Sequence, residues 1–177
     1  MEIKKNNVII KLYNGDITDL DTDAIVNAAN KELRGGSGVC GAIFNKAGRI
    51  ELQKECYEKG PIHTGEAAIT SGYSLKAKYI IHAVGPIYSN NDEKESKLLS
   101  SAYLSSLKLA EEYNLKSIAF PSISTGVYGY PILKASKIAF DTIINYEYKT
   151  LEKVVFVCYD TLTFEIYKRL FDEYNSK

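Results

Sequence analysis

The sequence lacks an excess of charge of either sign. Its 177 residues include 22 lysines and arginines and 22 aspartates and glutamates, which cancel at neutral pH. A protein without net charge does not attract nucleic acid or an anionic membrane by bulk electrostatics, and no apolar run approaches the roughly 20 residues that span a bilayer. We therefore expect neither nucleic acid nor membrane as a partner. An anionic ligand would have to be held by backbone amides and local geometry.

Cysteine and histidine are also scarce. The three cysteines, Cys40, Cys56 and Cys158, are an odd number without CxxC spacing, which argues against a disulfide scaffold and a structural zinc site. No cluster has metal-ligand spacing, so we expect metal-independent action and no cofactor. Residues 1–7 lack the apolar stretch of a secretion signal, and we expect a cytoplasmic protein.

What the sequence does contain is typical of one globular domain. Apolar residues make up 45% and charged residues 25%, and a chain of this length can bury one sizeable core. Alternating strands and helices predict an α/β fold with a sheet between helical layers, in one domain spanning residues 1–177 of a monomer. The expected strands are 8–13, 24–29, 67–70, 79–84, 116–120 and 154–159, and the expected helices are 38–58, 93–113, 131–145 and 161–174.

Two glycine-rich loops, residues 34–42 and 122–131, each follow an apolar strand. Glycine lets backbone N–H groups approach a ligand closely, and a helix that begins just beyond such a loop favours anions. In α/β folds ligands bind beyond the carboxyl ends of the strands, where both loops are expected. Together the two loops predict a clamp for a diphosphate.

Five motifs in this order resemble the macrodomain family across almost the whole chain. They are residues 15–18 with 23–30, the first glycine loop, Gly65-Glu66-Ala67, residues 82–86 and the second glycine loop. The resemblance implies a three-layer α/β/α fold with a mixed central sheet and a cleft for ADP-ribose. Within the family the chain is most similar to the branch of bacterial O-acetyl-ADP-ribose deacetylases and mono-ADP-ribosyl hydrolases.

The resemblance also implies roles for individual residues. Asp16 would accept a hydrogen bond from the adenine amino group, with Ile17 packed beside it and Tyr159 and Asp160 as further adenine-side neighbours. Asn30 would contact the distal ribose, and Tyr128 would cover that sugar. Backbone amides of both loops would hold the phosphates, and the residues concerned are Ser37, Gly38, Val39, Cys40, Gly41, Ser124, Thr125, Gly126, Val127 and Tyr128.

Several of these polar residues also have a purely structural interpretation. Asp16 and Asn30 could each close a turn, since short polar side chains commonly do so. Asn27 is expected to satisfy backbone groups between loops. His82 lies on an apolar strand and is expected to be a buried, hydrogen-bonded core residue, while Cys56 and Cys158 are expected to be packing residues.

The first loop departs from the hydrolase branch, in which it reads Gly-Val-Asp-Gly-Ala-Ile-His. Here residues 38–44 place Cys40 where that branch has the acidic residue proposed to activate or position water, and Phe44 where it has the histidine. A thiol and a hydrocarbon ring cannot do the same acid–base work at neutral pH.

Three explanations of Cys40 remain open. Hydrolysis could survive because the substrate's own phosphate and the loop geometry position the water. The protein could bind ADP-ribose without turnover. Cys40 could act as a nucleophile, which would require a nearby base, although a small apolar filler suits the position better.

We favour a hydrolase over a binding module. It would remove mono-ADP-ribose from modified acidic side chains of proteins, deacetylate O-acetyl-ADP-ribose, or do both, with Asn30, Cys40 and Tyr128 as the candidate catalytic residues. The alternative is a non-catalytic reader of ADP-ribose. The expected partners are therefore ADP-ribose, O-acetyl-ADP-ribose and mono-ADP-ribosylated proteins.

Overall fold

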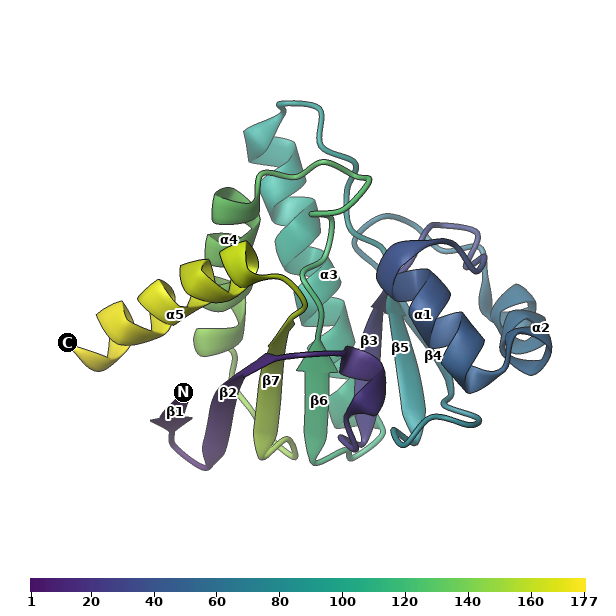
Figure 1. Cartoon of the computed structure of the whole chain (residues 1–177), viewed down its shortest axis with the longest axis horizontal. Helices are drawn as coiled ribbons and strands as arrows, with labels where there is room; N and C mark the ends of the chain where they lie inside the picture. The colour runs from purple at the N-terminus through teal and green to yellow at the C-terminus, as the bar shows by residue number, and fades with distance from the viewer.

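The computed structural model describes residues 1–177 and contains one mixed sheet with helices on both sides (Figure 1). The seven strands lie in the order β1-β2-β7-β6-β3-β5-β4. The elements are β1 (Glu2–Lys5), β2 (Val8–Asn14), the 3-10 turn η1 (Ile17–Asp19), β3 (Ala24–Ala28), α1 (Gly38–Ala47), α2 (Arg49–Lys59), β4 (Ala67–Ser71), β5 (Tyr79–Ala83), α3 (Asp92–Glu112), β6 (Ser117–Phe120), α4 (Ile132–Ile144), β7 (Lys153–Cys158) and α5 (Thr161–Asn175).

The five central strands are parallel, and the two edge strands are antiparallel to their neighbours. β2, β7, β6, β3 and β5 run in one direction, whereas β1 pairs antiparallel with β2 and β4 with β5. Parallel strands covered on both faces have nearly continuous apolar sequences, and β3 (AIVNA) is buried from Ala24 to Asn27. The expected three-layer α/β/α fold with a mixed sheet is confirmed.

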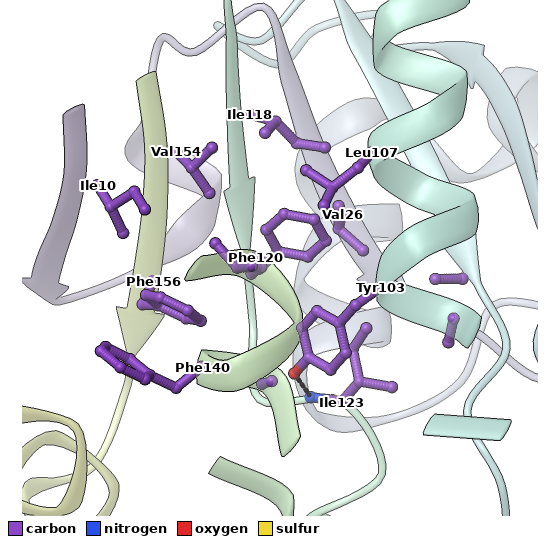
Figure 2. Close-up of a cluster of buried hydrophobic side chains, with 14 of the residues drawn as sticks. Ile10, Val26, Tyr103, Leu107, Ile118, Phe120, Ile123, Phe140, Val154 and Phe156 are labelled. Atoms are coloured by element: carbon purple, nitrogen blue, oxygen red, sulfur yellow. Dashed lines mark hydrogen bonds between the residues drawn. The ribbon is translucent and has the colours of Figure 1, made fainter. Parts of the chain in front are cut away.

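Alternate residues of β3 contribute to two separate hydrophobic clusters, because successive side chains of a strand point to opposite faces of the sheet. Ala24 and Val26 belong to a cluster of 30 buried residues shared with α3, α4 and α5. Ile25 belongs to a cluster of 17 shared with α1 and α2. Figure 2 shows the larger cluster, in which aromatic rings from strands and helices pack together, among them Tyr103 and Phe120, whose ring centroids lie 5.2 Å apart.

The helix expected over residues 38–58 is two helices. Gly48 adopts φ 112°, a conformation that favours glycine, and its N–H donates to the Phe44 carbonyl to end α1 before α2 begins at Arg49. The strand β1 was not predicted, since only Ile3 of its four residues is buried. None of the helices combines the length and apolar character that crossing a bilayer requires.

Candidate functional site

A cleft of about 330 Å³ opens at the carboxyl ends of β3, β5 and β6, the end to which the β6 and β7 arrows point in Figure 1. Both glycine loops contribute to it, as the sequence predicts. Parallel strands bring the segments that follow them to one edge of the sheet. The lining residues are Ala28, Ala29, Asn30, Gly36, Ser37, Gly38, Val39, Cys40, Gly85, Ser122, Ile123, Ser124, Gly126, Val127 and Tyr128.

The first loop ends in the N-terminus of α1, which opens into the cleft. Ser37 is the N-cap residue but makes no side-chain capping bond, and the first turn contains no acidic residue. The first N–H groups of a helix have no partner within the helix. The amides of Gly38, Val39 and Cys40 are therefore free donors at the positive end of the helix dipole, which suits an anion.

Gly41, expected to contribute an amide to phosphate, does not line the cleft, and that prediction is wrong in its geometry. Its N–H donates to the Ser37 carbonyl at 3.1 Å, as the helix requires. The glycine is needed for packing instead, because a Cβ at Gly41 would lie 2.6 Å from the Gly36 carbonyl oxygen. Gly41 thus lets the first loop fold back onto α1.

The second loop is held in shape by its own backbone and by α3. Tyr130 N–H donates to the Ser124 carbonyl at 2.9 Å, and Ser124 adopts φ 68°. The Tyr103 hydroxyl accepts the Ile123 N–H at 3.2 Å, the contact drawn as a dashed line in Figure 2. The Thr125 hydroxyl turns inward to the Ser122 carbonyl at 3.1 Å, and Thr125 does not line the cleft.

Ser124 and Tyr128 bring polar atoms of this loop to the cleft. The Ser124 hydroxyl is buried without a hydrogen-bond partner, and it lies so close to Gly85 that a Cβ there would be 2.2 Å from it. Tyr128 lines the cleft with partial burial, which raises the pKa of its hydroxyl. Its carbonyl accepts the Tyr88 N–H at 2.8 Å and fixes the backbone at the rim.

Asn30 lines the cleft and also closes a turn, so its structural interpretation is confirmed and its contact with a ribose stays a prediction. Its side-chain oxygen accepts the Arg34 N–H at 2.9 Å, and its Nδ2 donates to the Arg34 carbonyl at 3.0 Å. This pair fixes the path of the chain from β3 into the first loop. A contact with a sugar would use the remaining hydrogen of Nδ2 or the second lone pair of the oxygen.

Cys40 lines the cleft with 8% of its surface exposed. Its Sγ accepts the Gly36 N–H at 3.3 Å and lies 3.7 Å from the Arg34 carbonyl. Neither histidine lines the cleft, so no imidazole stands beside the thiol as the base that a cysteine nucleophile needs.

Phe44, which stands where the hydrolase branch that the sequence resembles has a histidine, does not line the cleft. It is 1% exposed and packs edge-on against the ring of His82, with ring centroids 6.3 Å apart. A Cβ on Gly35 would lie 2.8 Å from the Phe44 ring, so the first loop rests on this side chain. Phe44 therefore supports the loop from the protein interior.

Asn27 does not satisfy backbone groups, and that prediction is wrong. Its Nδ2 lies 3.1 Å from His82 Nδ1 and 3.6 Å from Cys40 Sγ. The prediction for His82 is confirmed, because it is fully buried and hydrogen-bonded, and burial lowers its pKa to about 3. Cys56 and Cys158 are packing residues as expected, and burial raises the pKa of each thiol to about 12.

The four residues expected beside adenine lie outside the cleft lining, at the ends of β2 and β7. Asp16 Oδ1 accepts the Thr18 N–H at 2.9 Å and its hydroxyl at 2.7 Å, which leaves Oδ2 free. The neighbouring side chains differ in exposure, since Ile17 is 4% and Tyr159 80% exposed. The Asp160 side chain caps α5 by accepting the Thr163 N–H at 2.8 Å. The Gly15 N–H donates to the Cys158 carbonyl at 2.9 Å and joins the two chain segments.

Six lining residues were not among the predicted ones. Gly36 belongs to the first glycine loop. The other five are small or apolar residues at or just beyond strand ends, a position that indicates the cleft even where the residue type does not, namely Ala28, Ala29, Gly85, Ser122 and Ile123. Another depression of about 470 Å³ lies on the outer surface of α1 and α2, and neither glycine loop contributes to it. No group of three or more His, Cys, Asp or Glu side chains could hold a metal ion.

Comparison with known proteins finds the same architecture in others. The family described as Macro domain matches residues 26–139. The chain is 48% identical over 168 residues to a macro domain-containing protein of Caldanaerobacter subterraneus, covering 93% of this chain and 96% of that protein. It is 47% identical over 167 residues to an O-acetyl-ADP-ribose deacetylase of Salmonella gallinarum, covering 91% and 93%.

A solved structure extends this similarity to three dimensions. A mutant of the Oceanobacillus iheyensis macrodomain, solved with ADP-ribose (ADPR), superimposes with a TM-score of 0.95 at 41% identity, covering 100% of this chain and 99% of that one. Because the superposition covers the whole of this chain, the structural similarity includes the loops as well as the sheet.

Proposed function

Because this chain belongs to the macrodomain family, we propose that it is an ADP-ribose-binding hydrolase. Its substrates would be proteins with mono-ADP-ribosylated acidic side chains, O-acetyl-ADP-ribose, or both. One observation carries the proposal: both glycine loops line one cleft at the carboxyl end of the sheet, and the first presents the unpaired amides of the α1 N-terminus there. The names of the Salmonella and Oceanobacillus proteins support the same ligand.

The diphosphate would lie between the two loops. The free amides of Gly38, Val39 and Cys40 would bind one phosphate, and amides from Ser124 to Tyr128 the other. Asn30 and Tyr128 would contact the distal ribose. Asp16 would read the adenine amino group through its free Oδ2, with Tyr159 beside the ring.

Hydrolysis would then depend on positioning. Water attacks C1″ as the bond to the protein carboxylate breaks, or attacks the ester carbonyl and releases acetate, and each reaction yields one proton. A substrate phosphate held beside the water can accept that proton, while oriented loop dipoles stabilise the developing charge. Catalysis by geometry alone would make this a slow enzyme, since a missing general base typically costs roughly 10²–10⁴-fold in rate.

A second candidate function is a reader that binds ADP-ribose without turnover. The observation in its favour is the composition of the cleft, whose lining contains no aspartate, glutamate or histidine. Such a cleft retains every amide donor needed for binding and has no side chain that is a strong base at neutral pH.

Two measurements on one sample separate these functions. Calorimetry measures ADP-ribose binding, and a time course follows product release from O-acetyl-ADP-ribose and from a protein mono-ADP-ribosylated on acidic residues. Binding with turnover is expected. Binding without turnover would make the protein a reader, and no binding would overturn the ligand assignment.

A further inference from the structure

A row of buried polar side chains crosses three adjacent strands behind the cleft. Asn27 on β3, His82 on β5 and Thr70 on β4 are exposed by 1%, 0% and 2%. Asn27 and His82 are register partners across the parallel pair β3 and β5. None of the three lines the cleft, so any influence on a ligand must pass through another residue.

The hydrogen bonds in this row have a defined direction. An amide nitrogen only donates, so His82 Nδ1 accepts from Asn27 Nδ2 at 3.1 Å and the ring proton resides on Nε2. Nε2–H then donates to Thr70 Oγ1 at 2.9 Å, and the Thr70 hydroxyl donates to the Ser71 carbonyl at 3.1 Å. Cys56 Sγ lies 3.7 Å from the same Nε2, so Thr70 is the nearer acceptor and favours the tautomer that Asn27 requires.

The row ends at the cleft on Cys40. The second hydrogen of Asn27 Nδ2 points to Cys40 Sγ, 3.6 Å away, and the Gly36 N–H reaches the same sulfur at 3.3 Å. Cys40 thus links β3 to the first glycine loop. Gly36 and Cys40 both line the cleft, so a shift of the sulfur would displace lining residues.

We propose that Asn27, His82 and Thr70 are positioning residues that hold the Cys40 side chain, and through it the first loop, in the ligand-binding geometry. The proposal rests on the proposed function for the identity of the ligand. Burying three polar side chains is unfavourable unless their hydrogen bonds are made, and Asn27 Oδ1 has no partner at all. Apolar residues would fill the same space without unpaired atoms, which points to a role beyond packing.

A matched pair of variants tests the proposal. In His82→Asn the amide oxygen lies near the place of Nδ1 and can still accept from Asn27. In His82→Gln the amide nitrogen lies near the place of Nε2, so the bond to Thr70 survives and Asn27 loses its acceptor. Both variants remove the buried ring, so both should melt at lower temperature than the parent.

Two measurements that do not require turnover report on the effect of these variants. ADP-ribose affinity is measured by calorimetry, and the alkylation rate of Cys40 by iodoacetamide with mass spectrometry. Cys40 is the thiol that reacts first, because Cys56 and Cys158 are 0% and 1% exposed and their pKa is raised to about 12. We expect His82→Gln to weaken affinity about tenfold, or about 1.4 kcal/mol, and to change the alkylation rate, while His82→Asn stays close to the parent in both.

If the two variants have the same affinity and the same alkylation rate, the proposal is overturned, because loss of the imidazole ring alone would then account for both changes. If His82→Gln does not fold, Thr70→Val is used as the test instead. Thr70→Ser is its control, because serine keeps the hydroxyl that accepts from His82. Valine removes the acceptor that favours the tautomer, so Thr70→Val should change both readouts in the same direction, and unchanged values would overturn the proposal. A parent that fails to bind ADP-ribose would overturn the proposed function, and alkylation would still decide whether the row holds Cys40.

Discussion

At the scale of single residues, the surroundings of Cys40 bear most directly on the proposed hydrolysis. Its sulfur accepts hydrogen bonds from Gly36 and Asn27, two donors that would suit a carboxylate better, because hydrogen bonds to an ionised acceptor are shorter and stronger. Two hydrogen-bond donors that a carboxylate could use are therefore in place around the Cys40 sulfur.

We predict that Cys40→Asp speeds hydrolysis of both substrates by about ten- to a hundredfold, since a positioned general base typically contributes 10²–10⁴-fold. The measurement is the initial rate of product release. Cys40→Ala is the control: at saturating substrate it should retain a rate within about threefold of the parent, although its affinity for ADP-ribose should fall as in His82→Gln, because the sulfur that joins Asn27 to Gly36 is gone. A Cys40→Asp rate at or below the parent's would show that the missing carboxylate does not limit the reaction, whereas inactivity of Cys40→Ala would favour a nucleophilic thiol.

Asp16 has a structural role and a proposed binding role, and these can be separated. Asp16→Ala loses the η1 cap as well as the adenine acceptor, so we expect a small drop in melting temperature and an affinity for ADP-ribose lower by roughly 10-fold or more, as for a lost hydrogen bond to a charged group. Asp16→Asn keeps a capping oxygen and is the control for stability. Calorimetry that finds unchanged affinity in Asp16→Ala would refute the placement of adenine.

At the scale of elements, the sequence predicts what local patterns determine. The apolar runs of β3, β6 and β7 and the glycines of both loops identify strands and turns, because their signals lie within a few residues. β1 is different, since its lysines and single buried isoleucine form a strand only because β2 offers an edge. Gly48 divides a helical pattern that reads as continuous, because one residue in the left-handed region is enough to break it.

In the candidate site, too, features set by local sequence are predictable and features set by tertiary contacts are not. The two loops are predicted from sequence because glycine loops after apolar strands indicate a ligand edge, whereas Asn30 is predicted only through the family resemblance of residues 23–30. The hydrogen-bond partners of Asn27 cannot be predicted from the sequence, because they depend on the register of β3 with β5 and on how the first loop folds back. Gly41 was assigned to phosphate because its role in packing against Gly36 is visible only in three dimensions.

Gly41→Ala provides a test of how the first loop packs on α1. The added methyl group would lie 2.6 Å from the Gly36 carbonyl oxygen, and we expect a loss of about 1–3 kcal/mol in unfolding free energy, with weaker ADP-ribose binding. Gly126→Ala, where nothing lies within 4 Å of the new carbon, should be within about 0.5 kcal/mol of the parent. Urea denaturation measures both, and equal stabilities would refute the close contact.

At the scale of the whole molecule, the buried His82 links stability to pH. Burial lowers its pKa to about 3 from an ordinary value of 6.5. Between these values the unfolded chain binds a proton that the folded protein does not, so the unfolding free energy falls as pH falls, by about 1.4 kcal/mol per unit. Above pH 6.5 this contribution is complete and constant.

We therefore predict that the parent loses stability between pH 6.5 and pH 4 more steeply than His82→Asn, which has no group to titrate at this position. Urea midpoints across this range measure the difference. Parallel curves for the parent and His82→Asn would show that His82 is not held neutral.

At the scale of the whole molecule, the sheet brings two loops that are distant in sequence to one edge, where both line the cleft that we propose binds a diphosphate. The most direct test is a crystal structure of the protein with ADP-ribose. We predict phosphate oxygens within hydrogen-bonding distance of the amides of Gly38 to Cys40 on one side and of the Ser124–Tyr128 loop on the other. A diphosphate bound elsewhere, such as in the depression on α1 and α2, would contradict the account.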